Sequence, residues 1–148
     1  MAGNYDIQVE GIDRTQIEVI IVKMKQTANR AARLAAIDTK ARLKEKSPFY
    51  KGVLARSWVV KKNGNLSWGI SSPINYLKAV VEGTGPGPRP FDPIAQWARY
   101  KGLPPGPVWW TIVHRGTKAN DFVDAVSRII EPRLNVYVEM AIRERGEL

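Results

Sequence analysis

The sequence contains no cysteine and only one histidine, His114. Without cysteine the chain has no disulfide bonds, thiolate nucleophiles or cysteine-ligated metals, and one histidine excludes a multi-histidine metal site. Long apolar runs are also missing: the run VIIV at residues 19–22 is far shorter than the roughly 20 residues of a membrane span. The first residues, MAGNYD, lack the basic and then apolar layout of a signal peptide. We therefore expect a soluble protein with no cofactor and no membrane partner.

Acidic residues are too few to balance the basic ones. The chain has 23 lysines and arginines against 14 aspartates and glutamates, a net charge of +9. Such an excess favours an anionic partner such as nucleic acid, although a structural protein can be basic without binding anything through its charge. Two adjacent lysines beside a predicted turn, Lys61 and Lys62, are the candidate DNA-facing residues. Because no known DNA-reading motif is present, contact with DNA would be independent of sequence and sensitive to salt.

One long helix is predicted in the first third of the chain, after a short strand that alternation predicts over residues 5–9. Thr15 and Glu18 have the spacing of a capping box, and Asp13 is a second available cap. Helical periodicity then continues to residue 46 without glycine or proline. A helix over 15–46 would be roughly 48 Å long. Its alanines permit close approach of another element and are candidate contacts with a second subunit: Ala28, Ala31 and Ala35.

A β-hairpin is predicted next, because residues 54–60 and 66–71 alternate apolar and polar on either side of the NGN turn at 63–65. A two-residue loop would divide the apolar residues between both faces of the hairpin. A three-residue loop would place Trp58 opposite Ile70 and gather the apolar residues on one face. Burial of one face fixes register, so the three-residue loop is predicted.

The second half of the chain alternates loops with short elements. Residues 76–82 fit either a strand or a short helix, and the glycines and prolines of 83–90 predict a loop. The remaining predictions are a short helix from Asp92 or Pro93 to Gly102, a strand at 109–114, and a final helix capped by Asn120 and kinked at Pro132. The chain is therefore predicted to be one α+β domain over 1–148, with a long N-terminal helix and a C-terminal helix packed on a small, mainly antiparallel β-sheet.

No catalytic constellation is visible in the sequence. His114 lies beside Arg115 in the predicted strand, where a surface histidine is expected, and the acids have no spacing that pairs two of them at one bond. The glycine-rich residues 83–87 are interrupted by proline and are not followed by the lysine of a phosphate-binding loop. We therefore expect no enzyme, no cofactor and no metal.

Three segments resemble one known family. Residues 47–58 (SPFYKGVLARSW) are similar to the signature S-P-x-x-x-G-x-L-x-x-S that follows a long N-terminal helix. Residues 76–84 (YLKAVVEGT) are similar to Y-A-x-x-V-E-x-G-T, with leucine in place of the first alanine, and residues 120–125 (NDFVDA) are similar to P-F-L-x-x-A. In this order they resemble the tail-completion, or head–tail joining (neck), proteins of long-tailed double-stranded DNA bacteriophages and prophages. The insert at about 85–115 and a second Gly-Thr after it resemble the longer members of that family.

The resemblance implies a structural virion protein, made in the cytoplasm of the bacterial host, that forms a ring, often a hexamer, on the tail tube. Its implied partners are the tail-tube protein, the head connector or stopper proteins, and the double-stranded DNA that passes through the lumen. Six copies at +9 each would carry +54, with Lys61 and Lys62 as lumen-facing candidates. The candidate interface residues are the three alanines together with Trp97, Trp109 and Trp110. The alternative is a stand-alone basic module that binds nucleic acid as a monomer with a steep dependence on salt.

Overall fold

The computed structural model describes Gly11 and residues 13–146 of the chain. Its elements, in order, are α1 (Arg14–Lys46), α2 (Val53–Ser57), β1 (Val59–Gly64), β2 (Ser67–Ser71), α3 (Leu77–Glu82), α4 (Phe91–Tyr100), α5 (Pro105–Arg115), α6 (Phe122–Ile130), the 3₁₀ turn η1 (Glu131–Arg133) and α7 (Leu134–Glu144). The α+β prediction is confirmed: a long N-terminal helix and a C-terminal helix accompany a two-stranded antiparallel sheet. The strand predicted at 5–9 lies outside the described residues.

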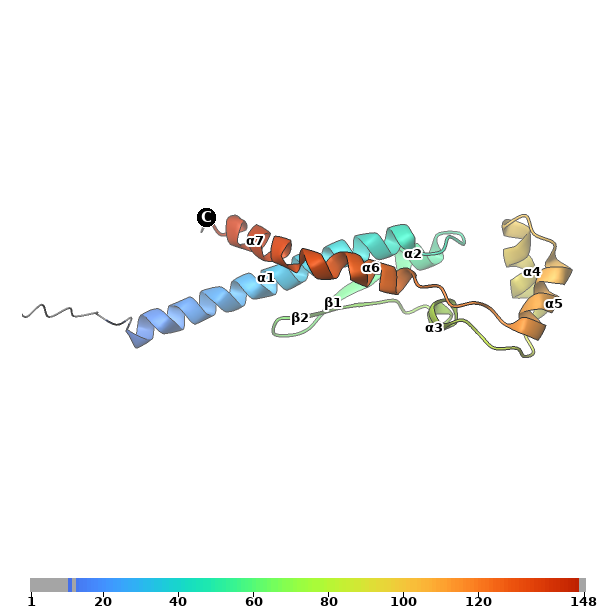
Figure 1. Cartoon of the computed structure of the whole chain (residues 1–148), viewed down its shortest axis with the longest axis horizontal. Helices are drawn as coiled ribbons and strands as arrows, with labels where there is room; N and C mark the ends of the chain where they lie inside the picture. Colours follow the sequence, from blue (N-terminus) through green and yellow to red (C-terminus); the bar gives the residue numbers. More distant parts are fainter. Residues whose placement is uncertain (1–10, 12, 147–148) are drawn as a thin grey trace, which may run out of the picture.

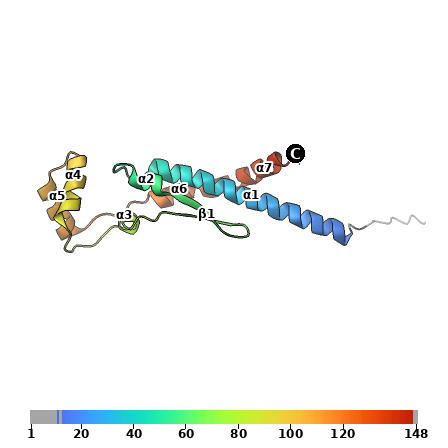
Figure 2. The same cartoon turned by 180° about the vertical axis from the view of Figure 1, so that it is seen from behind.

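The molecule is elongated, with α1 as its axis (Figures 1 and 2). The α6–η1–α7 segment packs along α1, and the β1–β2 hairpin also contacts this helix. At one end α4 and α5 form a helical pair beyond α2, while at the other end α1 continues past α7. The α4–α5 pair and the N-terminal part of α1 thus lie at opposite ends of the molecule.

The predicted long helix is confirmed, but its cap is not the predicted Thr15 pair. Asp13, the second available cap, accepts the backbone N–H of Gln16 through Oδ1 at 2.8 Å, and Gln16 accepts the N–H of Asp13 in return. This reciprocal capping box satisfies two of the free donors at the start of the helix. At the other end the helix stops at Ser47, whose backbone is extended as expected before Pro48.

A hairpin forms after α1, but the prediction that its first strand begins at residue 54 is wrong, and so is the predicted register. Residues 53–57 form α2 because Leu54 and Trp58, four apart, both turn into the core, and a short alternation fits a helix as well as a strand. The turn falls at residues 65–66, so that Val60 rather than Trp58 pairs with Ile70, two residues from the predicted register. The shift of two keeps the same side chains on each face. It is accommodated by a bulge between Lys62 and Gly64.

The strand predicted at 109–114 is also wrong, because these residues belong to helix α5. Proline at the first helical position is favourable, since its missing N–H has no partner there in any case. The apolar side of α5 packs on α4, where the Phe91 and Trp109 rings meet edge to face at 5.9 Å. Residues 76–82, which the sequence left open, form the short helix α3, and the helix predicted from residue 92 is confirmed as α4.

The predicted kink at Pro132 is confirmed. The chain leaves α6, makes the 3₁₀ turn η1 around this proline and re-enters a helix as α7. Because of this break, α6 and α7 pack one after the other along α1, and each contributes side chains to one of two small hydrophobic cores. One contains Leu43, Leu54, Trp58, Phe122 and Val126, and the other contains Ala31, Tyr137 and Ala141.

Candidate assembly surfaces

The three segments that carry the family resemblance meet in one core. From the first segment, Trp58 donates its indole N–H to Ser47 Oγ at 2.9 Å, and Ser47 donates in turn to the Leu43 carbonyl. From the third segment, Phe122 places its ring edge to face against Trp58, with centroids 6.3 Å apart. Trp58 and Ser47 are both buried, so this chain of hydrogen bonds fixes the end of α1 to α2 and α6.

The second segment joins the same core through α3. Val80 packs on the core cluster, and its carbonyl accepts the backbone N–H of Asn120 at 3.1 Å. The N-cap of α6 is Asp121 rather than the predicted Asn120, and its side chain makes no capping bond; Asn120, one residue earlier, accepts the N–H of Phe122 through Oδ1 at 3.1 Å. Residues from all three segments therefore contribute to one core.

The insert leaves the body of the protein through two paired Gly-Thr dipeptides. Thr84 and Thr117 form an antiparallel bridge with backbone N–H···O distances of 3.1 and 2.9 Å, and their hydroxyls lie 2.9 Å apart. Gly83 and Gly116, directly before them, have φ values of 75° and 74°, which favour glycine. A Cβ on Gly83 would lie 2.5 Å from the Thr117 carbonyl oxygen, and one on Gly116 would collide with the Thr84 carbonyl. Both positions therefore require glycine.

The insert also contacts the loop after α1. The Tyr100 ring packs edge to face on Tyr50 at 5.2 Å and is 6.2 Å from Phe49, whose carbonyl accepts the Lys101 ammonium at 2.6 Å. Between the insert and α3 lies an open, mainly apolar groove of about 590 Å³. Its lining includes Tyr76, Val80, Arg89, Ile94, Trp97 and Lys118.

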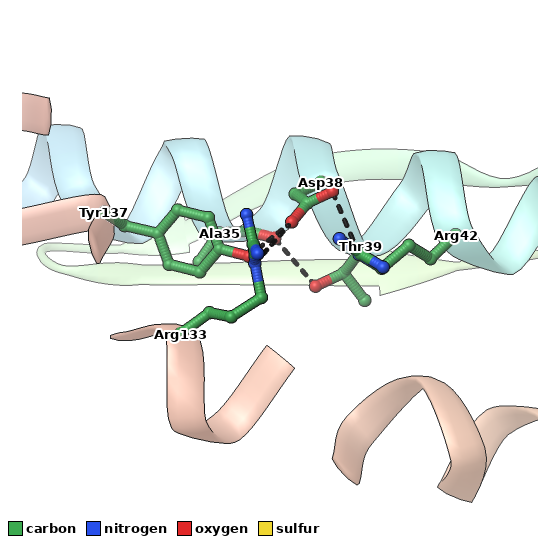
Figure 3. Close-up of polar contacts among 6 residues, drawn as sticks. All are labelled: Ala35, Asp38, Thr39, Arg42, Arg133 and Tyr137. Carbon is green, nitrogen blue, oxygen red and sulfur yellow. Dashed lines mark hydrogen bonds and ion pairs between the residues drawn. The ribbon is translucent and has the colours of Figure 1, made fainter. Parts of the chain in front are cut away.

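A polar network joins α1 to α7 (Figure 3). Tyr137, which is buried, donates its hydroxyl to Asp38 Oδ2 at 2.5 Å, while Arg42 Nε donates to Asp38 Oδ1 at 3.1 Å. Arg133 Nε lies 3.6 Å from the same carboxylate. Partial burial raises the pKa of Asp38, but the hydrogen bonds from Tyr137 and Arg42 and the two nearby guanidinium charges lower it by more. The carboxylate is thus held ionised at the centre of the junction.

A second set of contacts holds the far end of α7. Arg30 donates to both carboxylate oxygens of Glu144, at 2.5 and 3.1 Å. Arg145 donates to the Lys23 carbonyl at 2.8 Å and to Thr27 Oγ1 at 3.1 Å. These contacts end where α7 ends, and α1 extends beyond them toward its N-terminus (Figure 1).

The projecting part of α1, residues 14–24, is here called the α1 arm. Its apolar side chains are 44% to 66% exposed and belong to neither core cluster of the described residues: Ile17, Val19, Ile20, Ile21, Val22 and Met24. Four side chains of α7 that flank its packed face are 41% to 51% exposed, and they are here called the α7 flanks: Leu134, Val136, Val138 and Met140. Periodicity in the sequence predicted the helix but not that the apolar side chains of this stretch stay outside both core clusters of the described residues.

The structure divides the predicted interface residues. Ala31 and Ala35 pack against α7 of the same chain, so the close approach that alanine permits is made internally, and Ala28 is exposed. Trp97 and Trp109 are half-buried within the insert, where Trp109 donates its N–H to the Arg89 carbonyl at 2.9 Å. The other members of the predicted sets are exposed: Trp110, stacked on His114, and both lysines of the hairpin, Lys61 and Lys62.

No metal-binding cluster of three or more histidine, cysteine, aspartate or glutamate residues occurs in the described ranges. None of the helices within them is both long and apolar enough to cross a membrane. Comparisons with protein-family models, with curated proteins and with solved structures found no match.

Proposed function

We propose that this chain is a structural virion protein of the head–tail junction of a long-tailed bacteriophage, where identical copies form a ring around the passing DNA. The meeting of the three family-like segments in one core carries this proposal. Chance similarities at residues 47–58, 76–84 and 120–125 would have no reason to supply side chains and backbone groups that contact one another. A shared fold explains why these segments occur together.

The size of the surface supports a role in an assembly. The chain exposes 11073 Å² for a mass of 16.6 kDa, whereas a compact monomer of that mass exposes roughly 7,600 Å². The residues outside the description contribute at most roughly 2,000 Å², even if every one is fully accessible. The described part therefore has on the order of 2,000 Å² more surface than a compact domain of its size. Partner molecules in a ring and on the tail tube would cover such a surface.

The positions of the two ends suit a joining protein. In this proposal the α4–α5 insert contacts a tail or connector partner, because it stands away from the body on the paired Gly-Thr dipeptides. The exposed Lys61 and Lys62 face the lumen and ease passage of the polyanion through a ring of six copies. The chain acts through contacts rather than through chemistry.

Removal of this protein from the phage or prophage that encodes it tests the proposal. The expected lysate contains filled heads and separate tails that do not join, and the wild-type chain supplied from a plasmid restores complete particles. Normal particles in the absence of the chain would contradict the proposal. Monomeric, salt-sensitive binding to DNA together with normal particles would favour the nucleic-acid-binding alternative.

A further inference from the structure

The α1 arm is a helix that its own sequence does not favour. Residues 17–22 read IEVIIV, so that five of six positions are β-branched and lose side-chain freedom in a helix. Short helices in water depend on packing of an apolar face for most of their stability. Within the described part of the chain no apolar side chain of the arm belongs to a core cluster, and the contact of Arg145 with the Lys23 carbonyl lies at the end of the arm nearest the body. A partner surface that covered these side chains would stabilise the helix.

The arm is apolar on two sides. Ile17, Ile20, Ile21 and Met24 follow the i, i+3, i+4, i+7 spacing of one stripe, and Val19 and Val22 form a second stripe on the other side of the helix. The charges between the stripes are of both signs, and two of them, Arg14 and Glu18, already pair at 3.2 Å. The arm thus presents no field of one sign that would select DNA or an acidic lipid surface. Its chemistry fits an apolar protein surface.

The α7 flanks supply such a surface. They are aliphatic, and α7 and the arm are each about 16 Å long at 1.5 Å per residue. One arm can cover only one flank at a time, because the flanks lie on either side of the packed face of α7. Burying the stripe Ile17, Ile20, Ile21 and Met24 against the two side chains of one flank removes on the order of 300–500 Å² of apolar surface from water. That is roughly half of the apolar area in a standard interface of about 1,600 Å². The two surfaces together can form the apolar centre of one subunit contact.

We infer that the α1 arm of one copy docks against the α7 flanks of the next copy. The two surfaces lie on the same chain but are displaced from each other along α1, so the arm does not lie on the α7 flanks of its own copy. Tyr137 bonds Asp38, which is 18 residues after Ile20 and hence about 27 Å from it along the helix. In the ring of the proposed function, each copy gives its arm to one neighbour and receives an arm from another. Such a head-to-tail contact closes a ring when the rotation between copies allows it.

Disulfide trapping tests this contact directly, because the chain has no cysteine of its own. The Ile20→Cys protein is mixed with the Val138→Cys protein or with the Met140→Cys protein, so that each flank has its own probe. One protein of each mixture carries a size tag, and both are kept at high concentration under mild oxidation. Ile37→Cys is the matched control, since Ile37 also lies on α1 and is 47% exposed against 44% for Ile20. An intrachain link is not expected, because Ala141, the residue after Met140, packs with Ala31, which lies roughly 16 Å along α1 from Ile20, whereas bridged Cα atoms lie within about 7 Å.

We expect the Ile20→Cys mixture to give several-fold more mixed disulfide than the Ile37→Cys mixture with at least one of the two flank probes. Equal yields for the arm and control variants would overturn the inference. Dimers of Ile20→Cys alone that form as fast as the mixed product would also overturn it, because they would indicate an arm-to-arm contact.

The inference rests on the proposed function for its ring, but the two can fail separately. Rings on tail tubes without an arm-to-flank disulfide would refute the docking mode and leave the proposed function intact. An arm-to-flank disulfide in a protein that ignores tails would confirm the contact and refute the function.

Discussion

The paired Gly-Thr dipeptides provide the sharpest test of how the insert is held. In Gly116→Ala the new methyl group collides with the backbone carbonyl of Thr84, and the backbone at φ 74°, ψ −164° is a region that essentially only glycine adopts. That conformation costs about 1–3 kcal/mol for alanine. Relief of the clash by movement breaks the two backbone hydrogen bonds between Thr84 and Thr117, each with a net value of about 0.5–1.5 kcal/mol. The expected loss is therefore about 2–6 kcal/mol.

The matched control is Gly85→Ala, because a Cβ on Gly85 meets no atom within 4 Å and its φ is outside the left-handed range. Its free energy of unfolding should change by less than about 0.5 kcal/mol. With a urea slope of roughly 2 kcal/mol per molar, Gly116→Ala should lower the unfolding midpoint by about 1–3 M. If the insert opens while the body stays folded, the unfolding midpoint should fall by less than this, and the insert should instead be cut rapidly by proteases within residues 85–115. A Gly116→Ala protein that matches the control in both midpoint and proteolysis would refute the account of the bridge.

Three further outcomes are expected from other contacts. Because the pKa of Asp38 is lowered in the folded state, its stabilising contribution is complete above the unfolded pKa of about 4 and is lost as the pH falls through the folded pKa. The wild type should therefore lose more stability on acidification below about pH 4 than Asp38→Asn, and parallel urea titrations would refute this. Trp58→Phe removes the indole N–H that bonds the buried Ser47 hydroxyl and should cost about 1–3 kcal/mol in the same assay, whereas an unchanged midpoint would contradict it. Replacing Lys61 and Lys62 by glutamine should leave stability within about 0.5 kcal/mol but lower phage titre and DNA retention, and normal values of both would remove the lumen assignment.

The sequence predicted well those elements whose pattern is long. The helical spacing is sustained through all of α1, so a strand there was not a plausible alternative. The single proline between α6 and α7 likewise marked where the last helix breaks. Short patterns were ambiguous, because Leu54 and Trp58 are compatible with either one strand face or one helix face. The stretch at 109–114 is rich in β-branched and aromatic residues, yet Pro105 at the first position and packing on α4 make it a helix. The preceding prolines were the signal that could have identified α5.

The candidate surfaces depended on contacts that pattern does not reveal. Another element does approach Ala31 and Ala35 closely, but the sequence could not say that this element is α7 of the same chain, and Ala28 is exposed. That internal packing moves the exposed apolar surface toward the N-terminus of α1, onto the arm. The pairing of Gly83-Thr84 with Gly116-Thr117 was also hidden, although the repeated dipeptide on both sides of the insert is a readable signal.

We propose that copies of this chain form a ring on the tail tube. The most direct measurement is negative-stain microscopy of the purified chain mixed with tail tubes of the phage or prophage that encodes it, with light scattering of the chain alone. We predict rings, with a hole wide enough for duplex DNA, at one end of the tubes. Bare tube ends, with the chain remaining a monomer and binding DNA at low salt, would contradict the claim.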